Sequence, residues 1–209
     1  MTASIERLIS EGEHQHLDFK FAISDAKKIA RAMVAFANSE GGKLLIGVKD
    51  NGSIYGIRSE EEYYVLQSAA EMYCKPPVAI EFTRWVVSGK TILEVTIPPG
   101  KNKPYKAPSE EGKWTSYIRV DDQNLRANNI QVRVWERRNK KRNTVIEYSE
   151  REKKLLEYIA NKEKVRFMNI MKILKTTRLE TEDILVNLIS MNLVNIHITA
   201  DGISYSDNV

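Results

Sequence analysis

Residues 35–50 read Ala-Phe-Ala-Asn-Ser-Glu-Gly-Gly-Lys-Leu-Leu-Ile-Gly-Val-Lys-Asp, and this stretch decides the fold. Apolar side chains recur at helical spacing over residues 29–37, and Asp25 stands where it can cap that helix. Gly41-Gly42 predicts the helix end, because glycine adopts the left-handed C-cap geometry without steric cost. The apolar run over residues 43–48 then predicts a buried strand.

Further short elements lie on both sides of this helix and strand. Residues 17–21 alternate apolar and polar side chains, as a half-buried strand does. The turn signal at residues 50–53 follows the buried strand, and residues 60–73 have a helical pattern. Two more strands are expected at 78–87 and 91–97. The mixed order of helices and strands predicts an α+β fold with a mixed sheet.

The C-terminal third has a different pattern. Amphipathic helices are predicted at residues 150–159, 167–174 and 177–191, followed by two strands around a turn at Asp201-Gly202. Three helices followed by a hairpin predict a small winged-helix domain, a helix-turn-helix variant. The expected organisation is a first domain at 1–132, a basic linker at 133–146 and the winged helix-turn-helix domain at 147–209.

The composition is that of a globular protein. Of 209 residues, 42% are hydrophobic and 29% are charged, and no apolar run is long enough to span a bilayer. The N-terminus has no signal-peptide pattern, and Cys74 is the single cysteine, so we expect a cytoplasmic protein without disulfides or membrane association. The formal net charge of +4 is compatible with nucleic-acid binding.

Two glycine-lysine phrases could be mistaken for phosphate-binding loops. Gly89-Lys90-Thr91 matches the end of a P-loop, but Arg84 stands where the motif needs glycine, and the phrase lies between two expected strands. Gly41-Gly42-Lys43 follows a helix and precedes a strand, the reverse of the required order. No nucleotide cofactor is therefore supported by a P-loop.

Several phrases follow one another in order between residues 10 and 127. They are Gly12-Glu13, Leu17-Asp18-Phe19-Lys20, the stretch 35–50, Gly52 to Gly56, Pro98-Pro99-Gly100, Lys103-Pro104-Tyr105 and Tyr117-Ile118-Arg119-Val120. Together they resemble the Schlafen AlbA_2 family. The resemblance implies a Schlafen-core-like, mixed-sheet AlbA_2 domain. Members of this family are described as DNA-binding regulators and as ATP-binding proteins, and the related core of animal Schlafens is a metal-dependent ribonuclease.

The resemblance also implies a catalytic site. The ribonucleases use three carboxylates, which correspond here to Glu13, Asp18 and Asp50, and these would bind Mg²⁺ or Mn²⁺ through oxygen ligands. Asp18 replaces the glutamate of the family phrase and is one methylene shorter. Lys20 would share a strand face with Asp18 and neutralise a phosphate oxygen. Each residue also has a purely structural alternative. Asp50 could serve only the turn, Asp18 and Lys20 could form the solvated face of a strand, and Glu13 could be an ordinary surface acid.

Basic residues suggest where nucleic acid could bind. Lysines neutralise phosphates, and a tyrosine among them could stack on a base. The candidates are Lys101, Lys103, Tyr105, Lys106, Arg119, Arg126, Arg137, Arg138, Lys140, Lys141, Arg142, Lys175 and Arg178. Residues 101–106 could instead be a solvated loop, and the basic run 133–142 could be a plain linker. Acidic residues at the start of the third C-terminal helix leave DNA docking and protein contact equally open for the winged helix.

Three functions remain open on the sequence. The first is a nucleic-acid-binding, transcription-regulator-like protein that binds DNA or RNA. The second is a divalent-metal-dependent endoribonuclease that uses Glu13, Asp18 and Asp50. The third is an assembly or interaction protein. Because the animal Schlafen core joins two related lobes and this chain has one, a homodimer is also expected.

Overall fold

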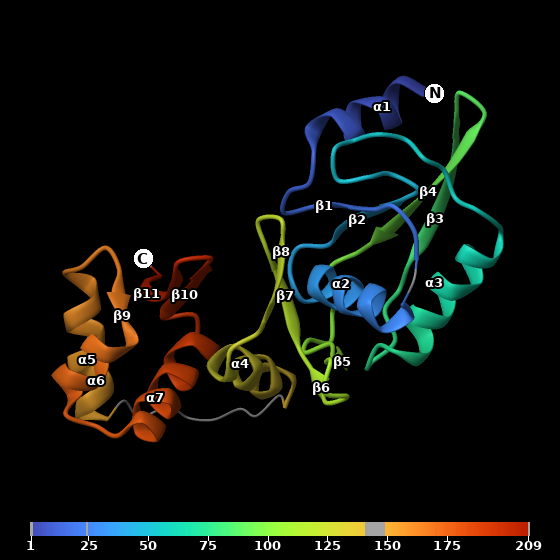
Figure 1. The fold of residues 1–209 in the computed structure, drawn as a ribbon. Helices are drawn as coiled ribbons and strands as arrows, with labels where there is room; N and C mark the ends of the chain where they lie inside the picture. Colours follow the sequence, from blue (N-terminus) through green and yellow to red (C-terminus); the bar gives the residue numbers. More distant parts are fainter. Residues whose placement is uncertain (1, 24, 141–148, 209) are drawn as a thin grey trace. The chain divides into compact units, whose positions relative to one another are not determined.

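The computed structural model describes residues 2–23, 25–140 and 149–208 (Figure 1). The chain forms two compact units, residues 1–127 and residues 128–209, called here the N-terminal and C-terminal units. The C-terminal unit begins with helix α4 (Asn129–Asn139), so the first part of the stretch expected as a basic linker is helical. Lys141 and Arg142 lie outside the described residues.

The N-terminal unit is built on a four-stranded sheet in the order β1-β2-β4-β3. The strands are β1 (Leu17–Lys20), β2 (Gly42–Ile46), β3 (Glu81–Val87) and β4 (Lys90–Ile97). Strands β1 and β2 are parallel, whereas β4 runs antiparallel to both of its neighbours. The sheet is therefore mixed, as the sequence predicted.

Helices cover both faces of this sheet (Figure 1). Helices α2 (Ala26–Asn38) and α3 (Glu61–Met72) pack on one face, where Leu44 and Ile46 of β2 join their core. Helix α1 (Thr2–Glu11) covers the other face, and its Ile5 packs with Leu17, Phe19 and Leu45. Successive strand residues point to opposite faces, so Asp18, between two residues of the α1 core, points to the α2 side.

The helix-to-strand transition confirms the first expectation from the sequence. Asp25 caps α2 by accepting a hydrogen bond from the Lys27 amide at 2.8 Å. The chain then turns through Gly41, which has φ +78° and donates its amide to the Phe36 carbonyl at 3.0 Å. Gly42 has another role, because a Cβ there would lie 2.4 Å from the Phe36 ring. One glycine makes the turn and the other lets the helix pack closely on the strand.

Two small hairpins complete the N-terminal unit. Strand β5 (Ala107–Pro108) pairs with β6 (Trp114–Thr115), and β7 (Tyr117–Val120) pairs with β8 (Gln123–Arg126). The buried amide of Asn38, at the end of α2, donates to the carbonyls of Tyr105 and Tyr117, both at 2.8 Å. Its oxygen accepts from the Tyr105 amide at 2.8 Å. This side chain therefore fixes the hairpins against α2.

The C-terminal unit has its own core. After α4 come α5 (Glu150–Ala160), β9 (Val165–Arg166), α6 (Phe167–Leu174), α7 (Arg178–Ser190), β10 (Val194–Thr199) and β11 (Gly202–Asp207). The three strands form a sheet in the order β10-β11-β9. Thr177 and Glu180 form a capping box at the start of α7, as their spacing predicted. Across both units, no helix in the described part has the length and apolar composition needed to cross a membrane.

Candidate functional site

A pair of carboxyl groups lies beside strand β1. The Glu13 carboxylate accepts a hydrogen bond from the Phe19 amide at 2.8 Å, which holds it against the strand. There it lies next to the side chain of Asp18. The ammonium of Lys20 lies 2.8 Å from Asp18 Oδ2 and 4.0 Å from Glu13 Oε1. Three of the four residues predicted for catalysis are thus in direct contact.

A buried arginine completes this group from the other side. Arg119 in β7 is 3% exposed, and its Nη2 lies 3.5 Å from Asp18 Oδ1. The same guanidinium donates to the carbonyls of Leu17 at 3.0 Å and His14 at 3.2 Å. Arg119 was expected on the nucleic-acid surface, but this position directs it inward. It positions the acid pair and is too buried to contact a phosphate.

The surroundings change the protonation of Glu13. Burial, followed by the hydrogen bond with Asp18, raises the pKa of Glu13 from 4.5 to about 7, although the Phe19 amide and Lys20 act in the opposite direction. Asp18 lies between two cations, Lys20 and Arg119, which balance its negative charge. Glu13 is therefore a carboxyl that can take up or release a proton near neutral pH.

Asp50, the third carboxylate of the expected triad, does not join this pair. It is exposed on the turn after β2, where the Gly52 amide donates to the Lys49 carbonyl at 2.8 Å. Within the described ranges, no three histidine, cysteine or acidic side chains are placed to hold a metal ion. The oxygens of Asp18 lie beside the cations Lys20 and Arg119, which already balance the charge of this carboxylate. This donor set does not fit a three-carboxylate site for Mg²⁺ or Mn²⁺.

The loop expected to bind nucleic acid is partly buried. Lys103 donates to the Ser39 carbonyl at 2.7 Å, and burial lowers the pKa of its ammonium. Tyr105 is 8% exposed and belongs to the α2 core, so it is not presented for stacking on a base. Lys106 is half-buried, whereas Lys101 is exposed.

The arginines of α4 bind within the C-terminal unit. They contact helix α7 and the residues just after it. Arg133 bonds to Asp183, Arg137 to Asn187, and Arg138 to the Ile189 carbonyl at 2.8 Å and to Asn192 at 2.6 Å. A run of basic residues that was expected to contact phosphate therefore holds one helix against another.

The remaining predicted cations differ in their pairing. Arg126 bonds to Glu111 at 3.2 Å, and Arg178 to Glu182 at 3.0 Å. Lys140 and Lys175 are exposed. Charge in the sequence therefore overstates the positive surface that these residues offer to an anion.

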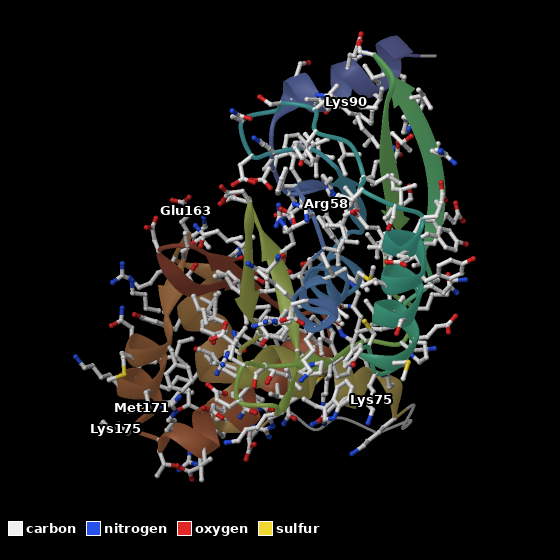
Figure 2. The ribbon with its side chains drawn as sticks, turned by 45° about the vertical axis from the view of Figure 1, so that its right-hand side comes forward. Arg58, Lys75, Lys90, Glu163, Met171 and Lys175 are labelled. Carbon is white, nitrogen blue, oxygen red and sulfur yellow. The ribbon has the colours of Figure 1, made fainter. Side chains whose placement is uncertain are left out.

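Sequence reasoning missed another group of cations, together with two aromatic rings. We call Phe21, Lys49, Tyr55 and Arg58 the aromatic-basic cluster. The Phe21 and Tyr55 rings lie 4.4 Å apart between centroids. The Lys49 ammonium lies 5.4 Å from the Phe21 centroid, and the Arg58 guanidinium 5.9 Å from it. Figure 2 labels Arg58 on the N-terminal unit.

The cluster was missed because its members are scattered along the chain. Phe21 directly follows β1, whereas Lys49, Tyr55 and Arg58 lie in the loop between β2 and α3. Parallel pairing of β1 with β2 brings their carboxyl ends to the same edge of the sheet. The cluster could have been predicted only by knowing that β1 and β2 pair in parallel, because the residues after two such strands lie close together.

Comparison with known proteins places the N-terminal unit in a family. The model of the family described as "Schlafen, AlbA_2" matches residues 13–128, which is more than half of the chain. No curated protein matches.

Among the solved structures that are similar to this chain are two that differ in how much of it they cover. One is the DIP2311 protein from Corynebacterium diphtheriae, with 15% identity and a TM-score of 0.50, covering 99% of this chain and 38% of that one. The other is the N-terminal domain of an ATP-dependent DNA helicase RecG-related protein from Nitrosomonas europaea. It has 25% identity and a TM-score of 0.39, covering 59% of this chain and 92% of that one. The first similarity shows the fold, and this chain spans little more than a third of that protein's length.

Proposed function

This chain belongs to the Schlafen AlbA_2 family, and we propose that it binds nucleic acid through its N-terminal unit. One observation carries the proposal. Lys49 and Arg58 are exposed at one edge of the sheet, and no carboxylate among the described residues forms an ion pair with either side chain. Cations without acidic partners are available to neutralise phosphates and to release counterions.

The neighbouring acids support this view of the edge. Glu60 pairs with Arg84 at 2.9 Å, and Glu62 accepts from the backbone amide of Arg58 at 3.0 Å. Neither carboxylate therefore pairs with the side chain of Lys49 or Arg58. Lys20, at the end of β1, adds a third positive charge, although it is bound to Asp18.

The test is fluorescence polarisation of the whole protein with labelled transfer RNA and with labelled duplex DNA over a salt series. We expect binding that weakens as salt rises, and about tenfold weaker binding in the double variant Lys49→Gln with Arg58→Gln. Arg126→Gln is the matched control, because Arg126 is exposed but paired with Glu111. Absence of binding at low salt, or equal weakening in the control, would contradict the proposal.

A second candidate function is phosphodiester cleavage. The observation that favours it is the acid pair, in which Glu13 has a pKa of about 7 beside an ammonium group. A carboxyl with this pKa can move a proton to or from a reacting oxygen, and Lys20 can neutralise charge that develops on a phosphate. Asp18 and Arg119 would then position Glu13 and Lys20 without contacting the substrate.

Cleavage is tested by incubating labelled transfer RNA with the protein in Mg²⁺, Mn²⁺ or chelator. If Glu13 transfers the proton, Glu13→Gln removes cleavage and leaves binding unchanged, while Asp50→Ala retains cleavage because Asp50 lies apart from the pair. Loss of cleavage in Asp50→Ala with retained binding would instead favour a three-carboxylate metal site. No cleavage by the wild type under any condition would leave a binding protein.

For the C-terminal unit we propose a winged helix. The support is its order of elements: helix α5, short strand β9, helices α6 and α7, and the β10–β11 hairpin that pairs with β9. Its role in DNA docking or in protein contact, a transcription-regulator role and a homodimer remain predictions. Light scattering of the pure protein tests the dimer, and a strictly monomeric mass would contradict it.

A further inference from the structure

The aromatic-basic cluster combines aromatic rings with cations, the two kinds of side chain that bind the bases and the phosphates of a nucleic acid. Phe21 and Tyr55 have rings 4.4 Å apart with an angle of 59° between their planes. Tyr55 is 45% exposed, whereas Phe21 is only partly exposed. Phe21 therefore supports the tyrosine ring, and close to half of Tyr55 remains exposed to solvent.

The backbone holds Tyr55 in this position. Its amide donates to the Gly47 carbonyl at 2.8 Å, and the Ile57 amide donates to the Thr91 carbonyl at 2.7 Å. Gly47 has φ +92°, and a Cβ there would lie 2.7 Å from the Gly56 carbonyl carbon, so the two chain segments cross closely. An exposed ring on a fixed backbone loses little conformational entropy when a ligand stacks on it.

Positive charge surrounds this ring. Lys49 lies 5.8 Å from the Tyr55 centroid, and Arg58 lies 5.9 Å from the Phe21 centroid. Lys90 also contacts the loop, where its ammonium donates to the Ile54 carbonyl at 2.8 Å. Figure 2 labels both Arg58 and Lys90 on the N-terminal unit. Aromatic rings interleaved with cations match the alternation of bases and phosphates in a single strand.

We propose that Tyr55, supported by Phe21, stacks on an unpaired base of a single-stranded nucleic acid whose phosphates contact Lys49 and Arg58. This deepens the proposed function and rests on it, since it names the class of nucleic acid. In a duplex the bases already stack on one another, so their faces are closed to Tyr55. Every base has an aromatic face, so the site binds without strong sequence preference.

The test uses a fluorescein-labelled single-stranded oligouridylate of about twelve nucleotides, within the site sizes usual for such proteins, and an RNA duplex of equal length. Polarisation gives the affinity of the whole protein for each. We expect Tyr55→Ala to weaken single-strand binding by roughly tenfold, while Tyr55→Phe keeps it, because phenylalanine retains the ring. The salt dependence should be the same in both variants, and duplex binding should be unchanged.

Trp114→Ala is the matched control. Trp114 is 39% exposed and lies under the Lys75 ammonium at 4.1 Å, so it is also an exposed ring with a neighbouring cation, but it lies on β6. Its removal should leave single-strand affinity unchanged. A second readout is the fluorescence of a single strand that carries 2-aminopurine, which stacking on Tyr55 should quench in the wild type and in Tyr55→Phe but not in Tyr55→Ala.

The outcomes separate this inference from the proposed function. If Tyr55→Ala binds the single strand as the wild type does, while Lys49→Gln with Arg58→Gln still weakens binding, the stacking site is wrong and the proposed function stands. If Trp114→Ala weakens binding as much as Tyr55→Ala, the cluster is not the site of stacking. If the wild type binds neither single strand nor duplex at low salt, the proposed function fails, and the stacking site fails with it.

Discussion

Helix α4 and the aromatic-basic cluster are both rich in positive charge, but they use it differently. The arginines of α4 bond to side chains and carbonyls of α7 and of the residues that follow it. In the cluster, Lys49 and Arg58 lie beside aromatic rings without a carboxylate partner among the described residues. The difference shows that the number of cations in a segment does not measure the charge it offers to a ligand, because pairing within the fold determines it.

The largest expected effect tests whether α4 is a structural helix. Val134 is fully buried in the core of the C-terminal unit, so Val134→Asp would place an unpaired charge there. We expect a decrease of about 3 kcal/mol or more in the stability of that unit. Thermal unfolding monitored by circular dichroism measures it, with Glu136→Asp on the exposed side of α4 as the control. A wild-type melting curve would mean that α4 is a linker, as the sequence suggested.

A smaller effect concerns the arginines themselves. Arg138→Ala removes hydrogen bonds to the Ile189 carbonyl and to Asn192. The expected cost is about 1 kcal/mol of stability in the C-terminal unit, because such bonds exchange with water on unfolding. Chemical denaturation reports it. Unchanged stability together with weaker nucleic-acid binding would mean that Arg138 binds nucleic acid and does not stabilise the fold.

The acid pair predicts a pH effect of moderate size. The pKa of Glu13 is raised to about 7 in the folded protein, so the stability that its protonated form provides is present below about pH 4.5 and is lost as pH rises through 7. Glu13→Gln keeps a neutral side chain at every pH. Its melting temperature should therefore depend less on pH between about 5 and 8 than that of the wild type. Identical profiles would mean that Glu13 ionises normally.

The smallest effect is expected for the stability of the cluster. Lys49→Gln removes an exposed cation that lies 5.4 Å from one ring centroid and 5.8 Å from the other. We expect a change of about 0.5 kcal/mol or less in unfolding free energy. A much larger decrease in denaturation would mean that Lys49 serves the fold, as the α4 arginines do, and is not kept for a ligand.

The sequence predicted the parts of the fold that depend on neighbouring residues. The stretch around Gly41-Gly42 predicted a helix followed by a buried strand, and Asp25 and Thr177 were correctly assigned as caps. Glu13, Asp18 and Lys20 were also found together, since they lie close to one another along the chain.

Contacts between distant residues could not be predicted in this way. Arg119 reaches Asp18 from a strand far along the chain, so it was taken for a surface cation. Tyr105 was expected in solvent, because nothing near it in sequence indicates that Asn38 binds its backbone. Phe21 and Tyr55 meet only because β1 and β2 pair in parallel. Each of these positions depends on the tertiary fold and not on local pattern.

The salt dependence of nucleic-acid binding distinguishes the cluster from α4 in a single experiment. The logarithm of the affinity for one labelled single strand is measured against the logarithm of salt concentration for the wild type and two double variants. We expect Lys49→Gln with Arg58→Gln to lower the magnitude of the slope by about 1.4, roughly 0.7 for each phosphate of the single strand that is no longer neutralised, and Arg137→Gln with Arg138→Gln to leave it unchanged. A lower slope in the α4 variant, with no change in the cluster variant, would show that α4 and not the cluster binds the phosphates.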